Sequence, residues 1–392
     1  MASLDGQTLK MGAQSDSDTE YIKSPDTPMP SNAMADLEAQ QSRTFSNNSE
    51  LDERKTTVKL MNKRKWLGLN PEAALDEEHD LAPHNDFLWG KIKIALKEPF
   101  AEMWGTFILV LFGLGGIAQV SLSKSPNGEF NPKYPGGWNY GGWQDINWAF
   151  GIGLMLGIYV AGNSGAFLNP AVTLTSCLLR KLPWRRLPMY WTAQILGAFL
   201  AAGVVYANYI DAINMTEGYG IRSVGGNTST AGIFATYPAD FTTRTTQFFE
   251  QFLASAVLMF MIFALQDDSN KGAFIASGAW FPLCLFFVMF GIATCFGWQT
   301  GFAINMARDL GPRLWTYCVG YGTDVWSAGG YYFWIPMVAP MVGCLFGGIV
   351  YDLFIFTGES PVNQPYWGIG QVINPYGAMK QRLRKQKQEG MV

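Results

Sequence analysis

A short motif that occurs twice, once in each half of an apolar region, constrains the fold of this chain more than any other feature. The first copy is SGAFLNPAVT (residues 164–173) and the second is GFAINMARDLGPR (residues 301–313). Each copy contains a glycine, then an aromatic residue, then Asn-X-Ala. Ionisable residues next to apolar segments, here Arg308 and Asp309, usually face a polar path through a membrane protein. One copy per half indicates an internal repeat with paired broken helices.

Six segments have the length and apolarity to span a bilayer, which takes about twenty residues each. They are residues 100–122, 146–160, 189–210, 248–265, 273–296 and 332–356. Two further apolar segments, 169–179 and 305–318, are too short to span, and each begins at one copy of the motif. We therefore expect an all-α membrane protein with six transmembrane helices and two re-entrant half-helices in an inverted repeat.

Polar residues are concentrated at the two ends of the sequence. Residues 1–92 are mostly polar and low in aromatics, which predicts a disordered tail, and residues 358–392 predict a second tail. The membrane domain is expected between them, at residues 93–357. Basic residues gather before the first span, between the second and third, and after the sixth, so the positive-inside rule makes both termini cytoplasmic.

Composition excludes several other classes of protein. The net charge of −3 and the lack of a sustained basic face give no case for nucleic-acid binding. The five cysteines are scattered and odd in number, which favours small core residues over a disulfide framework or a metal site. The sequence places no His/Cys/Ser constellation or phosphate-binding loop near the pore, so an enzyme is not expected. No cofactor is expected either.

The two copies of the motif predict two helix starts inside the membrane. Asn169 and Asn305 are favoured N-caps, and Pro170 suits the position after a cap, where Met306 stands in the second copy. Because the halves are inverted, the half-helices should meet tip to tip and form a positive centre with two Asn amides as donors. Such a centre repels cations and passes neutral molecules. The predicted pore residues here are Asn169, Pro170, Ala171, Asn305, Met306 and Ala307.

These motifs and their spacing resemble the major intrinsic protein family, and within it the aquaglyceroporins, with the long tails common in fungal members. The resemblance covers about residues 98–356 and implies one pore in each subunit of a homotetramer. It also implies a passive channel domain in the plasma membrane. Glu102 and Glu250 match the family's paired buried glutamates, which accept hydrogen bonds from the re-entrant loops.

The resemblance also places a selectivity filter. Strict water channels of the family have a His near the filter Arg, whereas the two histidines here, His79 and His84, both precede the first span. Aromatic and small side chains occupy the remaining filter positions, as in the glycerol branch. Rings would contact the carbons of a polyol while a guanidinium and carbonyls bind its hydroxyls. The predicted filter residues are Phe150, Ala293, Phe302 and Arg308.

Two residues depart from the family pattern. Phe167 replaces the His that usually precedes the first Asn and lines the cytoplasmic pore, and Met306 replaces the second Pro. Both changes predict a conductance that is reduced or gated. Taken singly, Phe150 and Phe302 would be ordinary packing residues, and Arg308 an ordinary residue at a helix end.

The sequence thus predicts a channel for glycerol and other small uncharged solutes, with some water, that excludes ions and protons. Hydrogen peroxide and urea are further candidate solutes. The alternatives are a channel used mainly for hydrogen peroxide or water, and a pore-impaired membrane sensor or scaffold that signals through its tails. A secondary transporter also uses inverted repeats, but no intramembrane carboxylate other than the two structural glutamates is placed for ion coupling.

Overall fold

The structure, a computed structural model, describes most of the apolar region of the 392-residue chain. The described residues are 58–66, 69, 87–123, 140–270, 280–364 and short pieces between 376 and 384. The chain divides into two compact units, Met1–Val58 and Lys59–Val392.

The described ranges contain helices and no strands. After a short helix at residues 58–66, the first half of the repeat contains α3 (Leu88–Ala95), α4 (Lys97–Leu122), α5 (Trp143–Ala161), η3 (Gly162–Ser164), α6 (Pro170–Leu179) and α7 (Arg186–Asn208). The connection contains α8 (Ile210–Glu217) and α9 (Ala231–Phe234). The second half contains α10 (Arg244–Gln266), α11 (Phe281–Cys295), α12 (Met306–Cys318), α13 (Asp324–Tyr331) and α14 (Trp334–Phe354).

Five of the six expected spans are long and apolar enough to cross a membrane, namely α4, α5, α7, α10 and α14. The fifth expected span is represented by α11, which has 15 residues. The first part of that expected span, residues 273–279, lies outside the described residues. The two short segments form α6 and α12, as predicted. The expected all-α membrane fold is confirmed.

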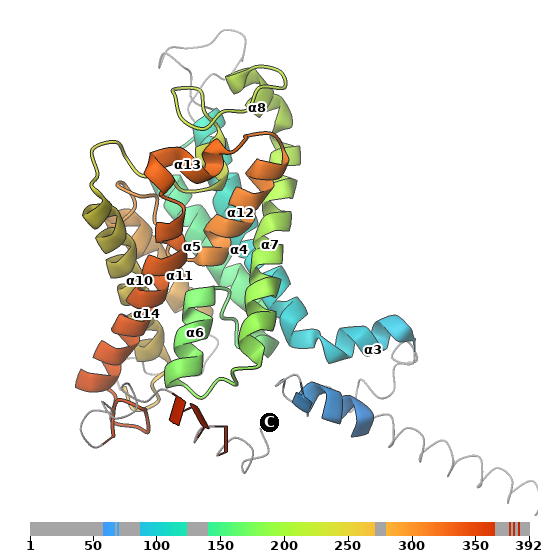
Figure 1. Cartoon of the computed structure of the whole chain (residues 1–392), viewed down its shortest axis with the longest axis vertical. Coiled ribbons are helices and arrows are strands. Elements are labelled where there is room, and N and C mark those ends of the chain that lie inside the picture. The colour runs from blue at the N-terminus through green and yellow to red at the C-terminus, as the bar shows by residue number, and fades with distance from the viewer. Residues whose placement is uncertain are drawn as a thin grey trace, which may run out of the picture. The chain divides into compact units, whose positions relative to one another are not determined.

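The two halves interlock through their half-helices. Within the halves, α4 packs against α5 and α7, and α10 packs against α11 and α14. Across the halves, α12 packs against α7, and α6 packs against α14. Figure 1 shows α6 and α12 in opposite halves of the bundle. Each half-helix is therefore held by the last long helix of the other half.

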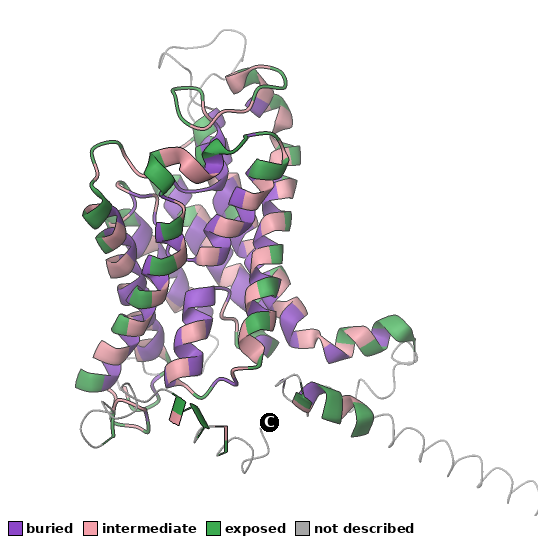
Figure 2. Cartoon of the chain, in the orientation of Figure 1, coloured by how far each residue is buried: buried purple, intermediate pink, exposed green. Residues whose placement is uncertain are grey.

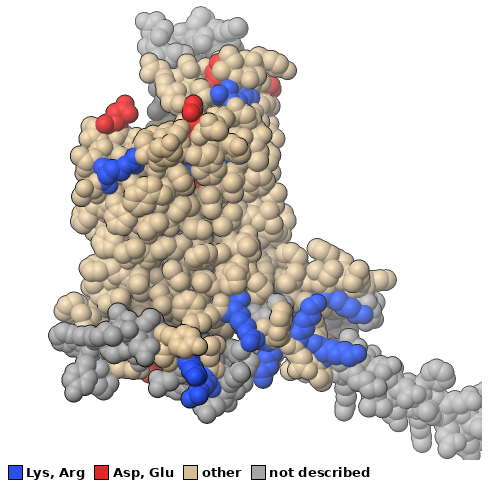
Figure 3. Space-filling model, in the orientation of Figure 1, with Lys and Arg blue, Asp and Glu red and all other residues tan. Residues whose placement is uncertain are grey.

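The surface of the bundle fits a bilayer. Figure 3 shows a broad middle zone without Lys, Arg, Asp or Glu on the visible face, while charged side chains lie toward both ends. Figure 2 shows exposed and half-buried residues on the outward sides of the long helices and buried ones inside. Outward-facing large apolar side chains include Leu200, Val204 and Phe346. An apolar outer surface is stable in hydrocarbon, so here it indicates contact with lipid.

Part of the segment predicted to be a disordered tail is helical. Residues 58–66 and α3 both lie within residues 1–92. The guanidinium of Arg64 is completely buried and donates hydrogen bonds to the Glu98 carboxylate and to the carbonyl of Ile94. A buried ion pair requires ordered surroundings, so the ordered unit begins before residue 93. Residues 1–57 lie outside the described residues.

Glycine allows the long helices to cross closely. A Cβ atom at Gly197 of α7 would lie 2.1 Å from the carbonyl oxygen of Met103 in α4. In the second half, a Cβ atom at Gly343 of α14 would lie 2.3 Å from the carbonyl oxygen of Phe252 in α10. Membrane helices associate through close packing of this kind, because lipid provides no hydrophobic driving force between them.

We predict that Gly197→Ala destabilises the protein by about 1–3 kcal/mol, because the added methyl group must separate α7 from α4. Gly115→Ala is the matched control, since a Cβ there meets no atom within 4 Å. Thermal unfolding of both purified variants in detergent measures the difference. Equal melting temperatures would show that the crossing tolerates a methyl group.

Candidate functional site

Both half-helices begin with an Asn cap. The Asn169 side-chain oxygen accepts a hydrogen bond from the N–H of Ala171 at 2.9 Å, and that of Asn305 accepts one from Ala307 at 2.9 Å. Asn305 also accepts one from Arg308 N–H at 3.3 Å. These caps satisfy N–H groups that a helix start otherwise leaves unpaired. The helix starts expected at both copies of the motif are therefore present.

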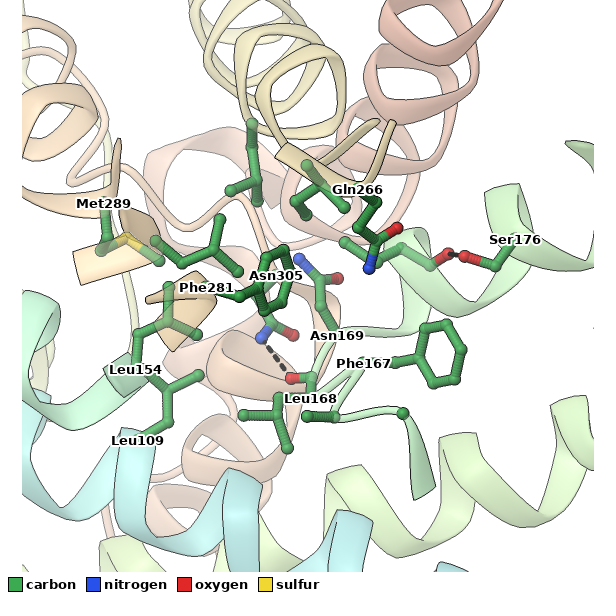
Figure 4. Close-up of a pocket in the computed structure, with 16 residues that line it drawn as sticks. Leu109, Leu154, Phe167, Leu168, Asn169, Ser176, Gln266, Phe281, Met289 and Asn305 are labelled. Carbon is green, nitrogen blue, oxygen red and sulfur yellow. Dashed lines mark hydrogen bonds between the residues drawn. The ribbon is translucent and has the colours of Figure 1, made fainter. Parts of the chain in front are cut away.

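Each cap residue also binds the opposite copy of the motif. The Asn169 amide donates to the carbonyl of Ile304 at 2.9 Å, and the Asn305 amide donates to the carbonyl of Leu168 at 2.7 Å. Figure 4 shows the second of these bonds beside a cavity. An Asn amide has two N–H donors, so this exchange uses one donor of each and leaves one for another acceptor. The half-helices therefore meet at their N-termini, where their dipoles concentrate positive charge.

The backbone before each cap is left-handed at matching positions. Leu168 has a φ of 52° and Ile304 a φ of 41°; two residues earlier, Ala166 has 51° and Phe302 has 37°. Left-handed backbone costs a non-glycine residue roughly 1–2 kcal/mol. Such conformations persist only where the surroundings hold them. The matching strain in both halves shows that the inverted repeat extends to the backbone of the loops.

Buried side chains hold the two loops in unequal ways. Glu102 accepts hydrogen bonds from Phe167 N–H at 2.9 Å and Leu168 N–H at 2.8 Å. The carboxylate of Glu250 accepts a bond from the Thr300 hydroxyl at 2.6 Å, while the N–H of Ile304 donates to the Gln251 side chain at 2.8 Å. The second loop therefore depends on a Glu–Gln pair, and sequence reasoning identified only the Glu.

The charged residues of the second motif divide into an internal ion pair and a separate cation. Asp309 pairs with Arg313 at 2.8 Å and also accepts bonds from the N–H and hydroxyl of Thr236 at 2.8 and 2.6 Å. Arg308 donates to the carbonyl of Phe234 at 3.0 Å, and its Nε atom has no hydrogen-bond partner among the described residues. The two adjacent ionisable residues Arg308 and Asp309 therefore have different partners, and Asp309 belongs with Arg313.

Three of the four predicted filter residues are in direct contact. The rings of Phe150 and Phe302 meet edge to face with centroids 5.0 Å apart. The Arg308 guanidinium carbon lies 5.1 Å from the centre of the Phe150 ring. These three side chains are almost completely buried and present two apolar faces and one cationic donor. The combination suits a molecule with both carbon and hydroxyl surfaces.

The fourth, Ala293, joins this group through Trp143. The Trp143 indole N–H donates to the Ala293 carbonyl at 3.1 Å, and its ring meets the Phe302 ring edge to face at 5.7 Å. A Cβ atom at Gly297 would lie 2.2 Å from the Trp143 ring, so the absence of a side chain at Gly297 leaves room for this ring. Trp143 was not identified from the sequence, because it lies at the end of a span beyond the recognised motifs.

A narrow cavity lies against the two caps. The space open to the centres of water molecules is about 40 Å³, enough for a few waters. Figure 4 shows Asn169 and Asn305 among mostly apolar residues. Helices α4, α5, α6, α10 and α11 contribute lining residues, which include Leu109, Leu154, Ser176, Gln266, Phe281 and Met289. A few polar groups among apolar walls are typical of a path for small molecules.

The two residues that depart from the family pattern have different surroundings. Phe167 is one of the residues that line the cavity, and its ring lies 6.0 Å from the ring of Tyr190 in α7. Figure 4 shows the Phe167 ring directed away from Asn305. Met306 is the first residue of α12 and is partly buried. Asn305 caps α12 without a following proline, so the motif functions structurally with Met.

The described residues contain no cluster of three or more His, Cys, Asp or Glu that could hold a metal ion. The five cysteines are free thiols.

Comparison with known proteins identifies related sequences. A sequence model described as "Major intrinsic protein" matches residues 89–351. Aquaglyceroporin-9 of Botryotinia fuckeliana is 55% identical over 76% of this chain and 62% of its own length. The probable aquaglyceroporin-2 of Gibberella zeae is 53% identical over 75% of this chain and 82% of its own length. This chain thus covers less than two thirds of the first of these relatives.

A solved structure has the same fold. The crystal structure of the aquaglyceroporin from Plasmodium falciparum aligns with a TM-score of 0.56 and 27% sequence identity. The alignment covers 66% of this chain and 96% of that protein. The aligned part of this chain thus corresponds to nearly the whole length of the other protein.

We predict that Asp309→Asn destabilises the protein by about 3–5 kcal/mol, because it leaves the buried Arg313 without its counter-charge. Asp324→Asn, at an exposed position of α13, is the control. Thermal unfolding in detergent, followed by loss of monodisperse protein, compares the two. A melting temperature for Asp309→Asn equal to that of the control would contradict the assigned ion pair.

Proposed function

This chain belongs to the major intrinsic protein family, and we propose that it is a passive channel for glycerol and other small uncharged solutes, with some water. The observation that carries this proposal is the contact of Phe150, Phe302 and Arg308. Two rings provide a surface for the carbons of a polyol. The guanidinium of Arg308, which donates a hydrogen bond to the Phe234 carbonyl, has further N–H donors for a hydroxyl oxygen.

Exclusion of cations would follow from the same residues. The charge of Arg308 is not cancelled by Asp309, which pairs with Arg313. Farther along, the two helix N-termini meet at Asn169 and Asn305. Both features create positive potential along one path, and positive potential raises the barrier for protons and metal cations. Neutral solutes do not encounter this barrier.

The names of the two fungal relatives favour a polyol over the alternatives, since both are called aquaglyceroporins. We propose that Phe167 narrows the cytoplasmic half of the path, because it lines a cavity of about 40 Å³. This narrowing would reduce the rate for a polyol more than the rate for water. Hydrogen peroxide, urea and water remain solutes to be compared with glycerol in one assay.

The remaining expectations concern assembly and location. We propose a homotetramer in the plasma membrane with both termini in the cytoplasm. The distribution of basic residues supports this orientation, because α3 and the loop between α6 and α7 are rich in Lys and Arg. With this orientation, residues 1–92 and 358–392 are cytoplasmic, and the Arg308 filter faces the extracellular side.

We predict that vesicles containing the purified protein take up glycerol faster than empty vesicles. Loss of a hydrogen bond from a charged donor, worth about 1.5–3 kcal/mol, should lower the glycerol-to-water permeability ratio by about ten-fold or more in Arg308→Ala. Stopped-flow light scattering measures glycerol, urea and water, and a dye assay measures peroxide.

Lys181→Ala is the control for this experiment, since Lys181 is half exposed and pairs with Glu359. Equal glycerol uptake in protein-containing and empty vesicles would refute the polyol channel. An unchanged permeability ratio in Arg308→Ala would show that the filter lies elsewhere. Peroxide uptake without glycerol uptake would favour the alternative solute.

We predict that Trp143→Ala increases the permeability of a four-carbon polyol relative to glycerol. The indole supports both the Phe302 ring and the Ala293 carbonyl, so its loss should widen the filter. Trp148→Ala is the matched control, because Trp148 lies on the same helix and packs against Phe286. A similar change in both variants would assign the effect to general loosening of α5.

A further inference from the structure

Lysine and exposed aromatic side chains form a patch on the helix at residues 58–66 and on α3. Figure 3 shows Lys and Arg gathered at this end of the unit. The lysines, all exposed or half exposed, are Lys59, Lys63, Lys65, Lys91, Lys93 and Lys97. We refer to these lysines, together with Trp66, Phe87, Leu88 and Trp89, as the basic-aromatic patch.

The patch has a net positive charge that the described residues do not neutralise. Neither helix contains an Asp or Glu. Glu98, the nearest acidic residue in the sequence after α3, is buried and already paired with Arg64. The described residues provide no ion pair to the six lysines of the patch. Among the described residues this positive charge is therefore left for another anionic group to balance.

The aromatic members are exposed to an unusual degree for a water-soluble surface. Trp66 is 70% exposed, Phe87 69% and Trp89 64%. Trp is enriched where membrane proteins meet the polar interface, because the ring is apolar and its N–H is a donor. The patch thus combines features suited to both the apolar and the charged layers of a bilayer surface.

The arrangement of α3 matches that of a helix lying in a membrane interface. At about 100° per residue, Leu88, Trp89 and Ile92 share one side, with Lys91 and Lys93 flanking it. Figure 1 shows α3 turning away from the axis of α4 at the end of the bundle. The Trp89 ring lies 6.0 Å from the Phe100 ring at the start of α4, so the apolar side continues into the first span.

The patch is fixed to the bundle rather than attached through a flexible segment. Arg64 is fully buried and binds Glu98 and two backbone carbonyls, those of Ile94 and Ala95. Arg185, in the loop between α6 and α7, donates to the carbonyl of Trp66 at 2.9 Å. Because both helices are anchored, their backbones do not have to be ordered when the patch binds a partner.

We propose that the basic-aromatic patch binds the anionic lipid headgroups of the cytoplasmic leaflet. This proposal rests on the orientation stated under Proposed function. The flanking lysines bind headgroup phosphates and carboxylates, while the aromatic and leucine side chains enter the boundary between headgroups and acyl chains. A bilayer is the occupant favoured here, because the apolar side of α3 is continuous with a membrane-spanning helix and a soluble acidic partner would leave that side uncovered.

The test uses the full-length protein in phosphatidylcholine bilayers that contain a minor fraction of phosphatidylserine. Spin-labelled phosphatidylserine and phosphatidylcholine give the relative association of each lipid with the protein surface. One lysine near an anionic surface corresponds to roughly five-fold in association, so averaging over the whole boundary predicts a selectivity of about two-fold or more. Raising the salt concentration from about 0.1 M to 1 M shortens the Debye length from about 10 Å to 3 Å. The selectivity for phosphatidylserine should then disappear.

The decisive variant replaces Lys59, Lys63, Lys91 and Lys93 with Gln. In this variant, phosphatidylserine should associate with the protein about as strongly as phosphatidylcholine does. Lys181→Gln is the matched control, because this cytoplasmic-side lysine already pairs with Glu359. Size-exclusion chromatography shows that each variant is folded. The assay does not measure solute flux, so a failure of this proposal is distinct from a failure of the channel proposal.

Two results would overturn the proposal. The first is equal selectivity in the wild type and the four-lysine variant. The second is an absence of selectivity in the wild type that appears when Asp76, Glu77 and Glu78 are replaced with Asn, Gln and Gln. That second result would make the chain's own acidic segment between the two helices the occupant of the patch.

Discussion

The exchange of hydrogen bonds between Asn169 and Asn305 and the opposite loops is the interaction on which the rest of this structure depends. Each Asn caps its own half-helix and binds the carbonyl that precedes the other Asn. Unpaired backbone groups in the middle of a membrane cost several kcal/mol each, so two broken helices can meet there only if they satisfy one another. The same contact brings two positive helix ends together, which is the feature on which the proposed barrier to cations rests.

The loops that deliver these caps are strained, and buried side chains counteract the strain. Left-handed residues recur before each cap, and each loop is held by carboxylate or amide oxygens from a long helix. In the first half, Glu102 binds two consecutive N–H groups. In the second half, Glu250 and Gln251 share the task. The two loops therefore have similar backbone conformations although different side chains hold them.

At the second copy of the motif, the described residues leave the buried cation Arg308 without a carboxylate partner. Arg313 neutralises Asp309, and the pair fixes the loop containing Thr236. Arg308 is thereby free of a carboxylate and faces the ring of Phe150. A buried guanidinium with an unpaired nitrogen is costly, which is consistent with a role toward a passing solute. At the opposite end, Arg64 is similarly buried but paired, and its function is to hold the basic-aromatic patch in place.

The sequence by itself determined the membrane class, the positions of the spans, the two half-helices and their Asn caps, because apolar length and capping are local properties. The family resemblance grouped Phe150, Phe302 and Arg308, and the structure brings their side chains into contact, while their role as a filter stays a prediction. Only the tertiary structure revealed that Asp309 pairs with Arg313 and that Gln251 shares the role of Glu250. It also revealed that Trp143 contacts Phe302 and Ala293 and that residues 58–66 are anchored through Arg64. Most of these contacts join residues far apart in the chain, and packing in three dimensions decides which of several available polar partners is chosen.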